Sequence, residues 1–232
     1  MRISSSCCAI IVAMMPVASA VAGVNVEFLF PDKPYLSAND SPFDLFSKGS
    51  DFRWEDFEDG LLNTAGLIGF GGEVRFPGSF TDSVDLDDGV LDGFGTAGHN
   101  YWTFAASNGE ETFARFEFGS ETLGLLPRSV GIVWTDGNFE AVVTFEAFGP
   151  DGESLGTMEI SSLDDGFSQG QTAEDRFMGA IYAGGISAIE IRANLGRIEL
   201  DHVQFGNLIP SPGALALLSL AAVLRRRRRR SR

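Results

Sequence analysis

The sequence is poor in cysteine and histidine, with two of each in 232 residues. Cys7 and Cys8 both lie near the start, so the rest of the chain can form no disulfide, no thiolate metal site and no cysteine nucleophile. Two histidines are too few for a typical zinc site without cysteines, unless acidic residues complete it.

Basic residues are also scarce, except at the two ends. Arg2 lies near the start, and Arg225 to Arg230 with Arg232 close the chain. Without these eight, the 17 lysines and arginines fall to nine, against 32 acidic residues, a net charge of −23 for the body. A body this acidic repels phosphate backbones, which excludes nucleic acid as a partner, and it attracts cations.

The N-terminal residues predict a secretory signal peptide over residues 1–22. Arg2 precedes a short apolar run from Cys7 to Val17, and small residues follow up to Ala22. We expect cleavage after Ala22, with Ala20 as the alternative. The run is shorter than the ~20 apolar residues that span a membrane.

The last residues, 207–232, predict a membrane-entering tail. Pro210, Ser211, Pro212 and Gly213 break regular structure, and Ala214 to Leu224 form an unbroken apolar stretch. A basic cluster follows, made of Arg225, Arg226, Arg227, Arg228, Arg229 and Arg230. An apolar segment with a basic end is typical of a short transmembrane helix whose basic end stays in the cytoplasm.

This tail resembles the PEP-CTERM sorting signal of bacterial surface proteins. Here the motif is Pro210-Ser211-Pro212, without the glutamate of the family pattern. The resemblance implies that the export machinery carries the chain to the inner membrane, where the tail is held transiently. It also implies that an exosortase, a transpeptidase-like membrane enzyme, recognises and removes the tail.

The body predicts an all-β fold, because short alternating or apolar runs recur between turn formers. We expect a jelly-roll-like β-sandwich over residues 51–206, with residues 23–50 as a looser leader segment. The predicted strands are 24–30, 52–57, 73–76, 101–105, 112–118, 129–134, 139–148, 154–160, 176–182, 187–192 and 197–205.

Two local features of these strands are more specific. Gly149-Pro150-Asp151-Gly152 lies between two strand-like runs and predicts a hairpin. In the last strand, Ile198 and Leu200 share one parity while Val203 and Phe205 share the other. That change of face predicts a β-bulge near Asp201 and His202, which would re-aim a carboxylate or an imidazole.

The body resembles uncharacterised secreted proteins of planctomycete type that carry PEP-CTERM tails. The phrases that carry the likeness are residues 35–37, 40–43, 55–64, 81–85, 131–137, 173–177 and 198–206. This family implies no activity. More distantly, the first strand of the sandwich, with Phe57-Glu58, and the final strand, with Asp201, resemble those of carbohydrate-binding jelly-roll modules. Such modules often hold a structural calcium ion at these positions. By that resemblance, Glu58 and Asp201 are candidate calcium ligands.

A second set of candidate calcium ligands comes from an acidic loop. Asp82, Asp85, Asp87 and Asp88 supply the carboxylate oxygens that calcium prefers, although their spacing does not fit an EF-hand. The alternative is a solvated acidic loop that keeps the protein soluble. If a site exists, calcium should raise the melting temperature.

Two short motifs match those of enzymes but lack the structural setting that each motif needs. Residues 93–98 match GxGxxG and residues 166–170 match GxSxG, but neither lies on the strand-to-helix turn that the motif requires. Trp54 and Trp102 are candidates for stacking on sugar rings, whereas Trp134 lies in an apolar run and is expected in the core.

Together these features predict an exported protein at the cell surface or outside the cell, with a structural or adhesive role. Divalent cations could bridge its carboxylates to an exopolysaccharide. The alternative is a carbohydrate-binding module for an exopolysaccharide. A glycan-active enzyme is the third and weakest hypothesis, and we expect the protein not to be an enzyme.

Overall fold

The computed structural model describes residues 25–43, 45, 51–76, 83–84, 98–104, 111–138, 140–161, 163 and 175–207. The signal peptide, the sorting motif, the apolar stretch and the arginine cluster all lie outside these residues. None of the helices in the described ranges is long and apolar enough to cross a membrane.

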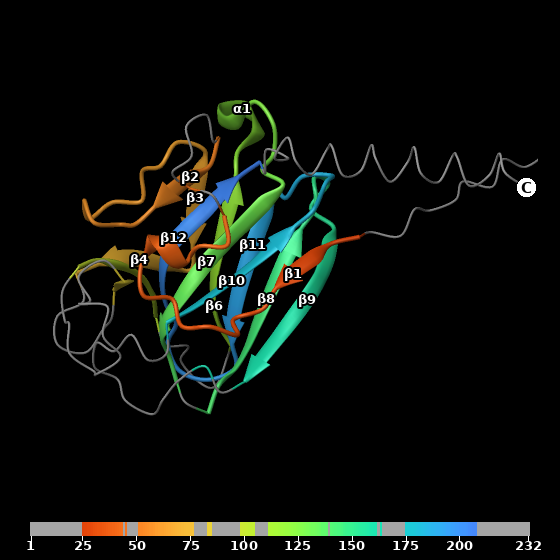
Figure 1. The fold of residues 1–232 in the computed structure, drawn as a ribbon. Helices are drawn as coiled ribbons and strands as arrows, with labels where there is room; N and C mark the ends of the chain where they lie inside the picture. The colour runs from red at the N-terminus through yellow and green to blue at the C-terminus, as the bar shows by residue number, and fades with distance from the viewer. Residues whose placement is uncertain are drawn as a thin grey trace, which may run out of the picture.

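The fold is a sandwich of two antiparallel sheets, which confirms the predicted all-β class (Figure 1). The strands are β1 (Glu27–Leu29), β2 (Arg53–Glu55), β3 (Leu67–Phe70), β4 (Gly72–Arg75), β5 (Asn100–Thr103), β6 (Thr112–Phe118), β7 (Ser129–Asp136), β8 (Val142–Phe148), β9 (Ser154–Ser161), β10 (Arg176–Ile181), β11 (Ala188–Ala193) and β12 (Glu199–Gly206). The short helical turns are η1 (Ala38–Asp40) and α1 (Ser120–Leu123).

The strand order is that of a jelly roll. One sheet runs β1-β10-β7-β12-β5-β4, with β2 also paired to β12, and the other runs β3-β6-β11-β8-β9. The pairs β8–β9, β7–β10, β6–β11 and β5–β12 nest as one long hairpin whose pairs alternate between the sheets. The innermost turn of this hairpin is the predicted turn at residues 149–152.

The alternation that predicted β6 also sets the main core. Ala114, Phe116 and Phe118 point between the sheets and are buried, while Phe113, Arg115 and Glu117 point away. Residues of the facing sheet close the same core, among them Ile132, Met178 and Leu200. Burial of these side chains supplies the main driving force for the fold.

A second, smaller core lies on the outer face of the seven-stranded sheet. Tyr35, Phe43, Val84, Val133 and Phe177 pack there. Strand β7 is therefore covered on both faces and buried along its whole length. Tyr35 and Phe43 cover it from the segment 30–43, which crosses this face in Figure 1, and Val84 joins them from elsewhere in the chain.

This covering layer corrects the leader boundary. We expected residues 23–50 as a looser leader before the sandwich, but β1 pairs with β10 as an edge strand of the sheet. Phe28 also packs against Phe145 of the opposite sheet, with ring centroids 6.3 Å apart. The strand at 24–30 was predicted, but the apolar side chains after Phe30 are too sparse to show a period, so their packing was not visible in the sequence.

The predicted strands agree with the observed ones except at β3. Residues Leu67–Phe70 were not predicted as a strand, because glycines at 66, 69, 71 and 72 interrupt the run. The structure uses two of them at positive φ, Gly66 at 88° and Gly71 at 88°. These turns let the chain enter β3 and pass from β3 to β4 in the other sheet.

We expect Phe116→Ala to lower the free energy of unfolding by about 3–5 kcal/mol, because it leaves a cavity in the main core. Phe113→Ala is the matched control on the same strand, since Phe113 is 40% exposed and Phe116 is 0% exposed. Urea unfolding followed by circular dichroism measures both. Equal losses for the two variants would contradict the assignment of the faces of β6.

Candidate functional site

The predicted bulge is present in β12 and organises the polar residues of the outer face. The register between β12 and β7 shifts between Asp201 and Gln204, and His202 has a φ of 46°. As a result Leu200 and Val203 both reach the main core, although their parities differ. A left-handed φ at a non-glycine residue is costly, so the surrounding contacts must hold it in place.

The bulge lies where β12 changes partner. On the side away from β7, Glu199 and Leu200 pair with β5, and residues 203–205 pair with β2. Asp201 falls between the two pairings and is fully buried. Its carboxylate accepts hydrogen bonds from Val84 N at 2.9 Å and from His202 N at 2.7 Å.

Ser83 brings the two predicted calcium ligands to one place. Its hydroxyl lies 3.1 Å from Asp201 Oδ2 and 3.4 Å from Glu58 Oε1. Glu58 also accepts a hydrogen bond from His99 N at 2.6 Å. A Cβ at Gly98, whose φ is +92°, would lie 2.4 Å from Ser83 Oγ, so this approach requires glycine.

The carboxylates of Glu58 and Asp201 accept hydrogen bonds from backbone N–H groups and from the Ser83 hydroxyl. Among the described residues, no three His, Cys, Asp or Glu side chains are grouped as metal ligands. Asp82, Asp85, Asp87 and Asp88 lie outside the described residues. The Glu58 and Asp201 carboxylates therefore serve here as anchors for the chain at Ser83, Val84 and His99, and calcium binding stays a prediction.

The bulge directs His202 toward Tyr35. His202 Nδ1 lies 3.2 Å from the Tyr35 hydroxyl, which also accepts a hydrogen bond from Gln204 Nε2 at 2.8 Å. Ser41 Oγ donates in turn to Gln204 Oε1 at 2.5 Å. The last strand therefore fixes the segment that covers it through side-chain hydrogen bonds.

The three tryptophans occupy different environments. Trp134 is 1% exposed in the main core, as predicted. Trp102 is buried, and the Arg75 guanidinium carbon lies 3.8 Å from its ring centroid. Trp54 is partly buried, with its ring centroid 4.7 Å from that of His202. Because Arg75 covers one face of Trp102, that face is not open to a sugar ring.

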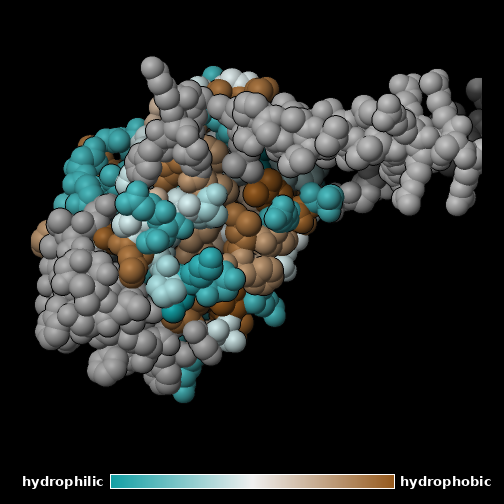
Figure 2. Space-filling view, viewed as in Figure 1, coloured by the Kyte–Doolittle hydropathy of each residue, from teal (hydrophilic) through white to brown (hydrophobic). Residues whose placement is uncertain are grey.

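A groove of about 560 Å³ opens on the outer face of the seven-stranded sheet. It lies between the chain that follows β1 and the chain that follows η1. Figure 2 shows hydrophobic and hydrophilic residues in adjoining patches on this side of the molecule. The lining residues are Phe28, Leu29, Phe30, Asp32, Lys33, Pro34, Tyr35, Asp40, Ser41, Pro42 and Phe177.

A second groove, of about 530 Å³, lies beside β3 and β4. Exposed Leu61 and Ile68 line it, and so does Tyr101. The Tyr101 hydroxyl donates to Gly72 O at 3.0 Å and accepts from Gly72 N at 3.2 Å. Burial raises the pKa of Tyr101, the hydrogen bond with Gly72 opposes this shift, and the charge of Glu73 adds to it.

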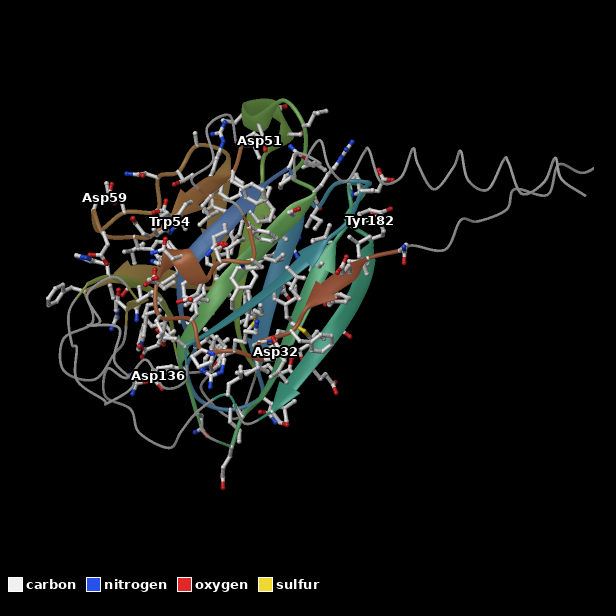
Figure 3. All side chains as sticks on the ribbon, viewed as in Figure 1. Asp32, Asp51, Trp54, Asp59, Asp136 and Tyr182 are labelled. Carbon is white, nitrogen blue, oxygen red and sulfur yellow. The ribbon has the colours of Figure 1, made fainter. Side chains whose placement is uncertain are left out.

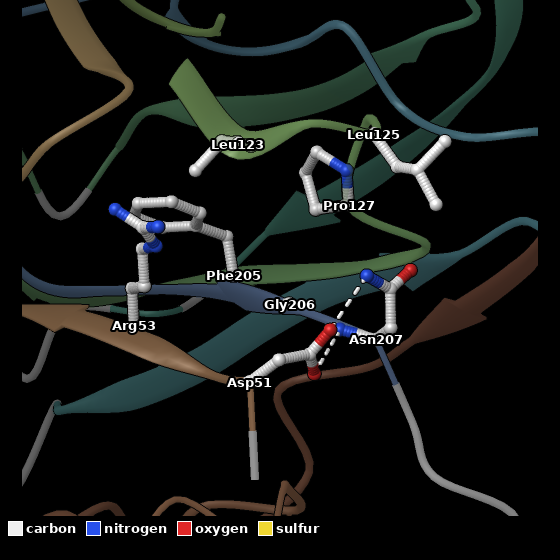
Figure 4. Close-up of a pocket in the computed structure, with 8 residues that line it drawn as sticks. All are labelled: Asp51, Arg53, Leu123, Leu125, Pro127, Phe205, Gly206 and Asn207. Atoms are coloured by element: carbon white, nitrogen blue, oxygen red, sulfur yellow. Dashed lines mark hydrogen bonds between the residues drawn. The ribbon is translucent and has the colours of Figure 1, made fainter. Parts of the chain in front are cut away.

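A small cleft of about 70 Å³ lies at the end of β12 (Figure 4). The Asp51 carboxylate accepts hydrogen bonds from Asn207 N at 3.0 Å and from Asn207 Nδ2 at 2.8 Å. Leu125 stands beside them, 69% exposed. The cleft is far smaller than the ~300–1,000 Å³ of ligand pockets, so we assign it to holding the end of β12.

Sequence reasoning found Glu58, Asp201 and His202 but missed Tyr35, Ser83 and the 560 Å³ groove. The available signal was the cluster of Pro31, Pro34 and Pro42 around aromatic and acidic residues, which is typical of a rigid surface segment. Nothing in the sequence indicated that this segment folds back over β12.

No family model and no curated protein matches the chain. Among solved structures, the K1 cleaved adhesin domain of Lys-gingipain from Porphyromonas gingivalis W83 matches with a TM-score of 0.43 and 12% identity, over 68% of this chain and 99% of that one. CpGH89CBM32-6, produced by Clostridium perfringens, has a TM-score of 0.25 and 14% identity, over 59% and 93%. TmCBM61 in complex with beta-1,4-galactotriose has a TM-score of 0.29 and 15% identity, over 65% of this chain and 88% of that one. All three TM-scores lie below 0.5, so the resemblance does not extend to function.

We expect Asp201→Asn to lower the free energy of unfolding by about 2–3 kcal/mol, because the new amide turns its NH2 group toward one of the two N–H groups that the carboxylate oxygens now satisfy. Asp151→Asn is the control, since Asp151 is exposed in the β8–β9 turn and asparagine also favours turns. Thermal unfolding of both variants tests this. An unchanged melting temperature for Asp201→Asn would contradict the anchoring role of this carboxylate.

We also expect stability to fall as the pH rises above ~10, where tyrosine in the unfolded chain begins to lose its proton. Because the folded pKa of Tyr101 is raised, the folded state keeps this proton longer, and its contribution is lost as the pH rises through that pKa. Tyr101→Phe should flatten the decline. Urea unfolding at pH 8 and pH 11 measures it, and identical declines in the two proteins would contradict the shift.

Proposed function

We propose that the chain is an exported binding protein with an adhesive or structural role at the cell surface or in the extracellular matrix. In this proposal, the N-terminal signal peptide directs export, and the tail at 207–232 is the sorting signal that an exosortase-type enzyme removes. No catalytic role is proposed.

The place where the core ends supports a tail that is separate from the sandwich. The residues of the main core and those packed against it lie between Val26 and Phe205. Asp51 holds Asn207 directly after β12, three positions before Pro210. Among the described residues, the core is closed by Phe205 and the chain after β12 is held at Asn207, which supports a tail that can be removed while the body stays folded.

The charge of the body supports an adhesive role in a matrix. A net charge of −23, left by nine basic and 32 acidic residues outside the ends, attracts divalent cations. On the outer face of the five-stranded sheet, only Arg115 and Arg192 offset the glutamates among the described residues, through pairs with Glu117, Glu190 and Glu111. Cations can then bridge the remaining carboxylates to acidic polysaccharide.

The second candidate function is carbohydrate binding. The 560 Å³ groove favours it, because the groove combines aromatic side chains with exposed carboxylate and ammonium groups. In this candidate function, the residues that line the groove take the place of Trp102, since Arg75 covers one face of its ring.

Cell fractionation tests the proposal. One tag is placed in the exposed turn at Asp151 and Gly152, and a second follows Arg232. We expect the turn tag at the cell surface or in the medium without the C-terminal tag. Deleting residues 208–232 should abolish retention at the membrane and leave a folded, exported body.

Replacement of Arg225 to Arg230 by serine is the control for the basic cluster, and it should block correct sorting without affecting the sandwich. Exported protein that still carries the C-terminal tag would contradict processing of the tail. Full-length protein found in the cytosol would contradict the export signal as well.

A further inference from the structure

The groove on the outer face has the size and the walls of a ligand site. Its volume of about 560 Å³ lies within the ~300–1,000 Å³ of small-molecule sites. One wall is the chain from Phe30 to Pro34, and the other is the chain from Asp40 to Pro42. Figure 3 shows Asp32 just beyond the end of β1, on the face that the viewer sees.

The floor of the groove is aromatic and is held in place from below. Tyr35 and Phe177 stack with centroids 6.1 Å apart and an interplanar angle of 22°. His202 Nδ1 and Gln204 Nε2 hold the Tyr35 hydroxyl, at 3.2 and 2.8 Å. The bulge in β12 therefore fixes the floor of the groove.

The rims supply an exposed ring and free polar groups. Phe30 is 61% exposed at one end. Asp32 and Lys33 are exposed beside it, and their side chains make no hydrogen bond or ion pair within the described part of the chain. On the facing rim, Asp40 uses Oδ2 to accept from Leu36 N and Ser37 N, which leaves Oδ1 available.

The walls are fixed before any ligand binds. Pro31, Pro34 and Pro42 restrict the backbone, and Tyr35 N donates to Asp175 O at 2.9 Å. Pro34 also forms a bridge with Arg176. A rigid site loses little conformational entropy on binding, so weak individual contacts can add up to measurable affinity.

This arrangement matches one ligand chemistry. A hexose ring presents an apolar C–H face to an aromatic side chain and hydroxyl groups at its edge to carboxylates and ammonium groups. Two carboxylates and one ammonium group, in a body with a net charge of −23, disfavour an anionic ligand. We propose that the groove between Phe30 and Asp40 binds a neutral hexose unit of a polysaccharide, with Phe30 against the ring and Asp32 and Lys33 hydrogen-bonded to its hydroxyl groups.

The proposal rests on the proposed binding function and names a site for it. The test is isothermal titration of the full chain with three neutral tetrasaccharides, built from glucose, mannose or galactose. Tetragalacturonate and tetralysine are titrated in parallel, and each titration is repeated with a calcium chelator. We expect at least one neutral tetrasaccharide to bind, with the same affinity in the presence of the chelator.

Variants locate the site. We expect Phe30→Ala to weaken binding about tenfold or more, and Asp32→Asn about threefold or more, since loss of a stacked ring generally costs more than loss of one hydrogen bond. Phe76→Ala is the matched control, because Phe76 is 64% exposed and follows β4 at the opposite edge of the sheet. It should leave the affinity within about twofold. Melting temperatures confirm that each variant is folded.

Absence of binding by all three neutral tetrasaccharides overturns the proposal, and so does binding that both groove variants leave unchanged. Binding of tetralysine alone would assign the groove to a cationic peptide, and binding of tetragalacturonate alone, lost with the chelator, would indicate cation bridging. Either result rejects the hexose site. Cell fractionation is independent of these titrations, so export and adhesion can hold even if the groove binds no sugar.

Discussion

The buried carboxylate of Asp201 holds the bulge on which the outer face of the sandwich depends. It accepts hydrogen bonds from Val84 N and His202 N and lies near the Ser83 hydroxyl, at the point where β12 changes partner from β5 to β2. These contacts compensate for the left-handed φ of His202. Without the bulge, Val203 and Phe205 would leave the main core, because side chains alternate along a regular strand.

The same bulge connects the two faces of the seven-stranded sheet. Toward the inside it keeps Leu200 and Val203 in one core. Toward the outside it turns His202 to Tyr35, and Gln204 adds a second hydrogen bond to the same hydroxyl. The segment 30–43 is thereby fixed over β7 and β10 as a second apolar layer, and the groove forms along it. Packing and candidate binding thus share one local irregularity.

The fold was largely predictable because its signals are local. Alternation in residues 112–118, the Asp151-Gly152 turn and the change of parity between Leu200 and Val203 each depend on neighbours in the chain. The candidate site was only partly predictable. Glu58 and Asp201 were found, but Ser83, which lies between them, is 118 positions from Asp201 in the sequence. Strand β3 was missed because four glycines hide a short apolar run.

The sequence by itself determined the acidity of the body, the absence of cysteine from it, its all-β class and the apolar and basic composition of its two ends, because these follow from composition and short-range periodicity. Only the tertiary structure decided that Arg75 covers Trp102, that the segment 30–43 belongs to the sandwich, and that Phe30, Asp32 and Asp40 line one groove. Those outcomes depend on contacts between residues far apart in the chain. No local pattern records such contacts, since they arise when the sheets bury their apolar faces.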